Sequence, residues 1–218
     1  MTEPKVIPGQ AGGLVYLLRV GVDPEVPPVI MLHGKGGDEK VMWVLEGVLP
    51  KGGIVASPRG PYRLPEGGYQ WKESTKGEWP SITDFARAGE ALLRMVDDLE
   101  RRFGLDRNRL VFMGFSQGAA LAFTGAALGM LHPAALVSLA GYLPEGEINL
   151  LHGSQVFWGH GLRDDLVPIE RARDDVARLR SVGAEVHYCE ADIGHKLGVE
   201  CARGLDIWLS EQFSLSYK

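Results

Sequence analysis

The feature that most constrains the fold is the stretch 109–128, in which a Gly-x-Ser-x-Gly motif at Gly114, Ser116 and Gly118 joins two apolar runs. The run before the motif predicts a buried parallel strand, and the run over 119–128 predicts a buried helix. The chain must therefore turn within very few residues. A serine at such a turn takes a strained backbone conformation that holds its hydroxyl clear of both elements, and the glycines let strand and helix approach. A turn of this kind presents a nucleophile.

The motif alone is weak support for a nucleophile, because the chain is rich in glycine, with 29 among 218 residues. A composition of this kind produces a Gly-x-Ser-x-Gly by chance in about one chain of six. The alternative interpretation is a tight strand-to-helix turn in which Ser116 only caps the following helix. The rest of the chain has to decide between the two.

Composition bounds the size and the partners of the protein. A chain of 218 residues with 45% hydrophobic content can bury one core, and we expect a single α/β domain over 1–218. The net charge is −5, and no basic cluster exceeds the pair Arg101 and Arg102. This argues against nucleic acid or an anionic membrane as partner and favours a small-molecule substrate. A homodimer stays open as an assembly.

Two further features bear on where the protein works. The first eight residues lack the basic-then-apolar pattern of a signal peptide, and the apolar stretch over 119–131 is too short to span a bilayer. Cys189 and Cys201 lie in no Cys-x-x-Cys motif, so we interpret them as free thiols, with a disulfide as the alternative. The expectation is a soluble cytoplasmic protein without stable membrane insertion.

Strands and helices alternate along most of the chain. Such alternation predicts a mostly parallel sheet with helices on both faces. After Asp38 and Ser81 we expect helix starts, with Asp84 completing the cap at Ser81, and Gly104 should end the second helix. The expected strands are 14–20, 28–33, 54–57, 109–115, 134–142, 155–159 and 184–190, and the expected helices are 38–48, 81–103, 119–128, 167–182 and 200–213.

The connection 58–80 is long for a compact domain, and it carries four glycines, four prolines and four aromatic residues. An idle connection of this length is uncommon. We expect it to lie over another part of the molecule.

A nucleophilic Ser116 needs a base to take its proton and an acid to orient that base. In parallel sheets such residues gather beyond the carboxyl ends of the strands. His195 follows the last strand by five residues and stands after a glycine, so it is the predicted base. His132, His152 and His187 do not follow a strand end, and we interpret them as surface or packing residues.

The acid should lie at the same sheet edge, and the segment 160–168 offers two adjacent candidates, Asp164 and Asp165. The residues themselves leave the choice open, because either carboxylate could reach the imidazole. The other would be solvated or would cap the helix that begins near residue 167.

A tetrahedral intermediate also needs two backbone N–H donors. Gln117, directly after the serine, can supply one, and the glycine-rich loop 33–37 can supply the other. The alternative for this loop is a phosphate cradle. It lacks both the Gly-Lys-Ser/Thr ending of a P-loop and the Gly-x-Gly-x-x-Gly of a dinucleotide site, which argues against that interpretation.

The order oxyanion loop, serine, aspartate, histidine resembles the α/β-hydrolase fold. Within that fold, the motifs at 32–37, 114–118, 160–168 and 194–195 resemble the phospholipase/carboxylesterase family, which includes acyl-protein thioesterases. The resemblance covers nearly the whole chain. It implies a mostly parallel central sheet with helices on both faces.

The resemblance also implies roles for particular residues. The family pattern His-Gly-x-x-Asp-x-x-Val-Pro places the triad acid at Asp164. The oxyanion N–H groups fall on Lys35 and Gln117, and His33 and Gly34 belong with the substrate-binding residues. The implied reaction uses no metal and no organic cofactor.

The sequence predicts a shallow groove for the substrate, because no insertion is long enough to form a separate lid domain. Its expected walls are Tyr62, Trp71 and Leu143. Lys35 is cationic where several relatives are apolar, which would suit a polar or acidic acyl group better than a long apolar tail.

The function that these features favour is a serine hydrolase acting on carboxylic ester or thioester bonds of small acyl substrates. Ser116, His195 and Asp164 would form its triad. One alternative is a non-catalytic binding protein on the same fold, since fold does not imply function. Another is a lysophospholipase, peptidase or lactone-type hydrolase.

Overall fold

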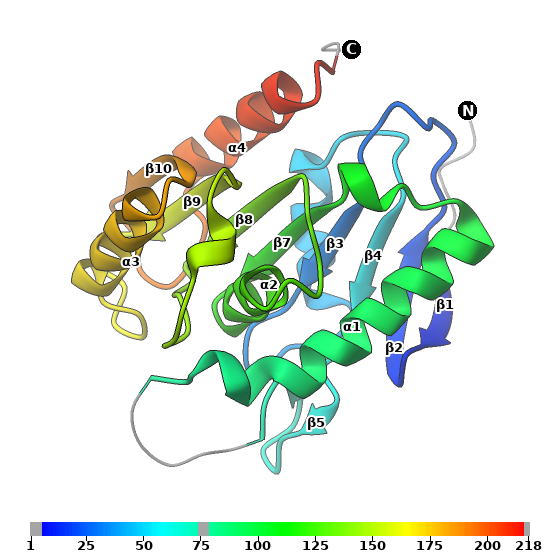
Figure 1. The fold of residues 1–218 in the computed structure, drawn as a ribbon, viewed down its shortest axis with the longest axis horizontal. Coiled ribbons are helices and arrows are strands. Elements are labelled where there is room, and N and C mark those ends of the chain that lie inside the picture. Colours follow the sequence, from blue (N-terminus) through cyan, green and yellow to red (C-terminus); the bar gives the residue numbers. More distant parts are fainter. Residues whose placement is uncertain (1–5, 74–78, 216–218) are drawn as a thin grey trace.

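The computed structural model describes residues 6–73 and 79–215, which are built around an eight-stranded sheet (Figure 1). The strands are ordered β1-β2-β4-β3-β7-β8-β9-β10 across the sheet. A separate two-stranded hairpin pairs β5 with β6. The strand bounds are β1 Val6–Ala11, β2 Leu14–Arg19, β3 Val29–Leu32, β4 Val55–Pro58, β5 Tyr62–Arg63, β6 Tyr69–Gln70, β7 Val111–Phe115, β8 Ala135–Leu139, β9 Gln155–Gly161 and β10 Glu185–Ala191.

The six strands β4, β3, β7, β8, β9 and β10 pair in parallel, and the antiparallel pairings of this sheet are β1 with β2 and β2 with β4. This confirms the mostly parallel sheet that the sequence predicts. β7, the strand before the serine motif, lies between β3 and β8. The carboxyl ends of the parallel strands therefore meet along one edge, with β7 near its middle.

Helices cover both faces of the sheet. On one face α1, α2 and α3 bury Leu92, Phe123 and Val176 in one apolar cluster, and on the other η1 and α4 bury Met42 and Trp208 in a second. No separate helical lid occurs within residues 6–73 and 79–215. The helix bounds are η1 Val41–Val48, α1 Ile82–Phe103, η2 Arg107–Arg109, α2 Gln117–Ala127, η3 Asn149–Leu151, α3 Ile169–Ser181 and α4 Val199–Gln212, where η marks a 3-10 helix.

The predicted boundaries of α1 are confirmed. The backbone N–H of Ser81 donates to Asp84 Oδ2 at 2.7 Å, which is one half of a capping box. Gly104 ends the helix in the left-handed region with φ 69°, where a glycine pays no side-chain penalty. The helix therefore spans 22 residues and packs its apolar side on α2 and the sheet.

Local structure differs from the sequence prediction at three places. The short strands β5 and β6 within the connection 58–80 are not among the predicted strands. β1 is not predicted either, because Pro8 and Gly9 interrupt its pattern, and such residues are tolerated on an edge strand. The helix expected after Asp38 is a 3-10 helix that begins at Val41. Asp38 Oδ1 still accepts hydrogen bonds from the backbone N–H groups of Lys40 and Val41, at 2.9 and 3.2 Å.

The interpretation of the cysteines as free thiols is wrong. Cys189 on β10 and Cys201 on α4 form a disulfide. The bond closes a loop that contains His195, since the two cysteines are 12 positions apart on either side of it. The thiols therefore no longer support the expectation of a reducing cytoplasm. Separately, none of the helices in the described ranges combines the length and the apolar character needed to cross a bilayer.

Candidate active site

The sharp turn between β7 and α2 carries Ser116 in a conformation that few non-glycine residues adopt, with φ 53° and ψ −118°. Strand and helix meet tightly there. A Cβ on Gly114 would lie 2.3 Å from the backbone N of Ala119, and a Cβ on Gly118 would lie 2.1 Å from the carbonyl O of Leu32. Both contacts involve backbone, which cannot yield, so both positions require glycine. The turn has the local form of the predicted nucleophile elbow.

Asp164 and His195 lie together at the carboxyl ends of β9 and β10. His195 Nδ1 is 2.7 Å from Asp164 Oδ2, and the Asp164 side chain is fully buried. Asp164 Oδ1 accepts from the backbone N–H groups of Leu166 and Val167, at 3.0 and 2.9 Å. Asp165 is exposed. Of the two carboxylates that the sequence left open, Asp164 is the one joined to the imidazole.

His195 stands beside the serine turn. Its ring meets the ring of Phe115, the residue before Ser116, edge-on with 4.9 Å between centroids. No hydrogen bond joins Ser116 to His195 in the part of the chain that the structure describes. Such contacts often tighten only when substrate binds. The structure thus brings the three predicted triad residues to one sheet edge and links two of them directly.

The loop after β3 lies against the same turn, and a Cβ on Gly34 would lie 3.3 Å from Ser116 Cβ. His33 is buried, and both of its ring nitrogens form hydrogen bonds, one within this loop and one to the segment 58–80. The backbone N–H of Gly60 donates to His33 Nε2 at 2.9 Å, so the proton is on Nδ1, which donates to Gly34 O at 2.7 Å. Burial lowers the pKa of His33, which keeps the ring neutral at pH 7.

This hydrogen bond orients the next N–H group. A trans peptide points its C=O and its N–H in opposite directions, so fixing Gly34 O also fixes the Lys35 N–H. Within the described ranges, the backbone N–H groups of Lys35 and Gln117 donate to no acceptor in the protein. Gln117 is the first residue of α2, where the N–H groups are free to bind an anion.

The β5–β6 hairpin clamps this loop in place. Gly36 N donates to Tyr69 O at 2.8 Å, and Tyr69 N donates to Gly37 O at 2.9 Å. Trp71 N donates to Gln117 Oε1 at 2.8 Å, and Trp71 Nε1 donates to the carbonyl O of His33 at 2.7 Å. The segment 58–80 therefore lies over the loop and the serine turn, as its length predicted. Residues 74–78 of that segment lie outside the described part.

The predicted substrate-binding residues, taken together with the predicted oxyanion residue Lys35, divide into two groups. Tyr62 is partly exposed and Lys35 is exposed. The side chains of His33, Trp71 and Leu143 are fully buried, and Gly34 is buried too. The prediction that Trp71 and Leu143 form the walls of an open groove is therefore wrong, because both side chains pack inward. Trp71 instead holds the loop after β3 through its hydrogen bond to the carbonyl O of His33.

His160 is a residue of this region to which the sequence analysis gave no role. It is the sixth residue of β9, is buried, and lies within 3.5 Å of Asp164 Oδ2 through its Nε2 atom. The available signals are its position at a strand end and its place as the first residue of the family pattern that marks Asp164. Burial lowers its pKa as well, so the ring is neutral at pH 7.

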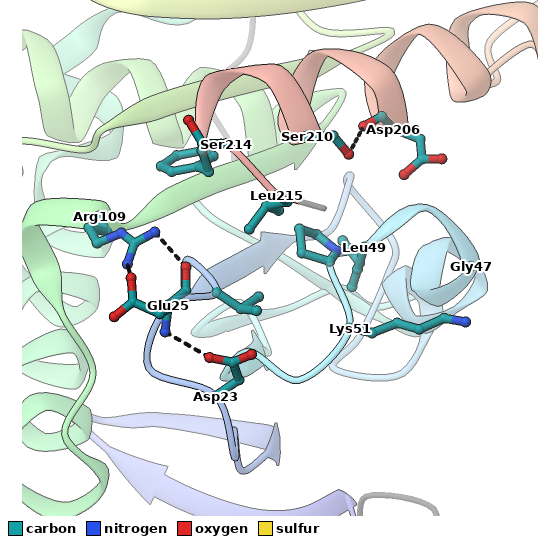
Figure 2. Close-up of a pocket in the computed structure, with 13 residues that line it drawn as sticks. Asp23, Glu25, Gly47, Leu49, Lys51, Arg109, Asp206, Ser210, Ser214 and Leu215 are labelled. Carbon is teal, nitrogen blue, oxygen red and sulfur yellow. Dashed lines mark hydrogen bonds and ion pairs between the residues drawn. The ribbon is translucent and has the colours of Figure 1, made fainter. Parts of the chain in front are cut away.

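A cavity of about 540 Å³ lies elsewhere, among residues that precede the parallel strands and residues at the end of α4 (Figure 2). Arg109 there donates to the carbonyl O of Glu25 and also pairs with its carboxylate, 3.6 Å away. Functional residues of parallel sheets gather at the opposite edge. The cavity contains none of the predicted catalytic residues.

A mostly parallel sheet covered by helices on both faces, with a serine at the sharp turn after β7, defines the α/β-hydrolase class. The chain belongs to the phospholipase/carboxylesterase family, whose model matches residues 19–201.

Individual proteins agree with this assignment. A rice protein (Oryza sativa subsp. japonica) named "Probable inactive carboxylesterase" is 32% identical over 124 residues, which cover 52% of this chain and 49% of the rice protein. The chain spans about half the length of the curated relatives it matches.

Two solved structures share the fold at a TM-score of 0.82 and 22% identity. The protein YahD, solved with malic acid, is matched over 91% of this chain and 99% of its own. A carboxylesterase of Bacillus cereus is matched over 91% of this chain and 94% of its own.

Proposed function

We propose that the protein is a serine hydrolase that cleaves carboxylic esters of small acyl groups. The observation that carries this proposal is the 2.7 Å hydrogen bond between His195 and the fully buried carboxylate of Asp164, beside the strained turn at Ser116. A buried carboxylate on Nδ1 leaves the lone pair of His195 on Nε2, where a base needs it. Membership of the phospholipase/carboxylesterase family supports the same reaction class.

In the first half of the reaction, Ser116 Oγ bonds to the acyl carbon while its proton passes to His195 Nε2. The carbonyl π electrons move to the oxygen. The unpaired N–H groups of Lys35 and Gln117 would hold the resulting oxyanion. When the intermediate collapses, the alcohol or thiol leaves with the proton from His195.

In the second half, water gives a proton to His195 and attacks the acyl-enzyme. A second tetrahedral intermediate forms at the same two N–H groups. It releases the carboxylic acid and returns the proton to Ser116. Asp164 keeps its charge throughout and stabilises the imidazolium that forms twice per turnover.

The proposed preference for particular acyl groups is based on Lys35. Its side chain is exposed, and it belongs to the loop whose backbone touches the serine turn. An ammonium at this place favours acyl chains that end in a polar or negative group. The malic acid in the YahD structure, a dicarboxylic acid, is consistent with this preference. Thioesters remain within the proposal, since the same steps expel a thiol.

The rival function is a binding protein that keeps the fold without turnover. The rice relative's name and the absence of a Ser116–His195 hydrogen bond among the described residues favour it. Hydrolysis of p-nitrophenyl acetate and butyrate by wild type and Ser116→Ala separates the two. Our proposal predicts turnover in wild type that the variant loses by several orders of magnitude. Equal rates in both would establish the rival.

A further inference from the structure

Residues 162–168 form the loop that carries Asp164, called the acid loop below, and the side chain of His160 lies between this loop and the core. β9 and β10 pair in parallel, with His160 opposite Glu190, and both strands then lead into the loops that carry Asp164 and His195. These loops touch, because a Cβ on Gly161 would lie 2.3 Å from Gly194 O. The side chains of His160 and Asp164 are both fully buried. Any polar atom here must find its partner within the protein.

The neighbours of His160 assign its tautomer. Trp158 Nε1 can only donate, and it points to His160 Nδ1 at 3.5 Å. The proton of the neutral ring is therefore on Nε2. That atom lies 2.8 Å from Val167 O, to which it donates, and 3.5 Å from Asp164 Oδ2. The imidazole thus directs an N–H at the carbonyl and the carboxylate together.

Val167 links these contacts into one unit. Its N–H donates to Asp164 Oδ1 at 2.9 Å while its carbonyl accepts from His160. His160 consequently holds the turn that orients Oδ1 and also lies beside Oδ2, the oxygen that receives His195. A displacement of the carboxylate by a fraction of an ångström would misdirect the imidazole.

We propose that His160 is a positioning residue for Asp164, which acts through the acid loop to keep the carboxylate aligned with His195. This inference rests on the proposed function for its kinetic consequences, and on the geometry alone for its spectroscopic ones. A neutral donor suits the role because it satisfies the buried carboxylate without competing with the imidazolium for its charge.

The kinetic experiment replaces His160 by two amide side chains of different length, asparagine and glutamine. Glutamine places its N–H near the position of His160 Nε2, whereas asparagine is too short to do so. We expect His160→Asn to lower kcat about tenfold or more with KM within about twofold, and His160→Gln to recover most of that loss. His187→Asn is the matched control, because the His187 ring stacks on Phe157, away from the acid loop. Its kcat should stay within about twofold of wild type.

The same change in an Asp164→Asn background separates positioning from general damage. If His160 acts through Asp164, adding His160→Asn to Asp164→Asn should lower kcat by less than about threefold. The proposal would be overturned if His160→Asn lowered kcat as much in the Asp164→Asn background as it does in the wild-type background. It would also be overturned if His160→Asn alone left kcat unchanged. Failure of Asp164→Asn itself to slow the reaction would instead overturn the triad.

Nitrogen NMR of the imidazole rings needs no variant and no activity. In the native protein we expect His160 as the neutral Nε2–H tautomer and His195 with a far-downfield Nδ1–H signal. His160→Asn should shift or broaden that signal, while His187→Asn should leave it unchanged. A native His160 protonated on Nδ1 would overturn the proposal even if the asparagine variant does not fold.

Discussion

His195 Nδ1 lies 2.7 Å from Asp164 Oδ2, whereas the neighbouring carboxylate of Asp165 is exposed to solvent. Two adjacent aspartates thus have different environments. The backbone N–H groups that bind Asp164 Oδ1 fix the carboxylate, so that Oδ2 stays within hydrogen-bonding distance of His195 Nδ1. The orientation of the base depends on this single side chain.

The first prediction tests that dependence. Asp164→Asn should lower kcat by about 10³-fold, because an amide can donate to Nδ1 and so favours the wrong tautomer. Asp165→Asn should change kcat by less than about tenfold and serves as the control. Steady-state kinetics with p-nitrophenyl butyrate measure both. A larger loss in Asp165→Asn than in Asp164→Asn would reverse the assignment of the acid.

The second prediction concerns substrate preference. Lys35→Met keeps the backbone N–H that we place in the oxyanion site and removes only the ammonium. We expect the ratio of kcat/KM for a carboxylate-terminated acyl ester to that for butyrate to fall about fivefold, the value of about 1 kcal/mol for a solvated charge pair. Competition between the two esters measures the ratio. An unchanged ratio would show that Lys35 does not face the acyl chain.

The third prediction concerns the Cys189–Cys201 disulfide, which closes the loop around His195. A disulfide that closes a short loop lowers the conformational entropy of the unfolded chain, which stabilises the native state by about 3 kcal/mol. Reduction or Cys201→Ser should therefore lower the free energy of unfolding by about that amount, measured by urea denaturation with and without dithiothreitol. Two reactive thiols in the unfolded, non-reduced protein would contradict the pairing.

The fourth prediction uses the buried histidines. Burial lowers the pKa of His33 and of His160 below about 6.5, the value expected in the unfolded chain. Below that pH the unfolded state binds protons that the native state refuses, so stability falls as pH falls. The slope of the unfolding free energy against pH measures how many more protons the unfolded state binds than the native state. Between pH 6.5 and 5, His160→Gln should reduce that number by up to about one. A slope equal to wild type would mean that His160 titrates alike in both states.

Local patterns predicted much of this molecule because they report local causes. The apolar runs around Ser116 determine strand and helix, and Gly114 allows the close contact that the turn makes with Ala119. Ser81 and Asp84 cap their own helix in the same way. In such cases the interacting atoms lie within a few residues of one another.

The predictions for Trp71 and for the cysteines fail because their partners lie further away in the sequence. Trp71 is buried because His33 and Gln117, far along the chain, accept its N–H groups. Cys189 and Cys201 meet because α4 folds back on β10 after the histidine loop. These two pairings leave no periodicity or spacing in the sequence. His160 differs, because its partners Trp158, Asp164 and Val167 are near it in the chain, and the family pattern that contains it marks only the acid.

The most direct test of the central claim is labelling by a fluorophosphonate, which reacts with a serine only when a base and an oxyanion site activate it. Tryptic mass spectrometry of the labelled protein identifies the modified residue. We predict one adduct, on Ser116, that is absent from Ser116→Ala and strongly slowed in His195→Ala. An unlabelled wild type, or a label that persists in Ser116→Ala, would contradict it.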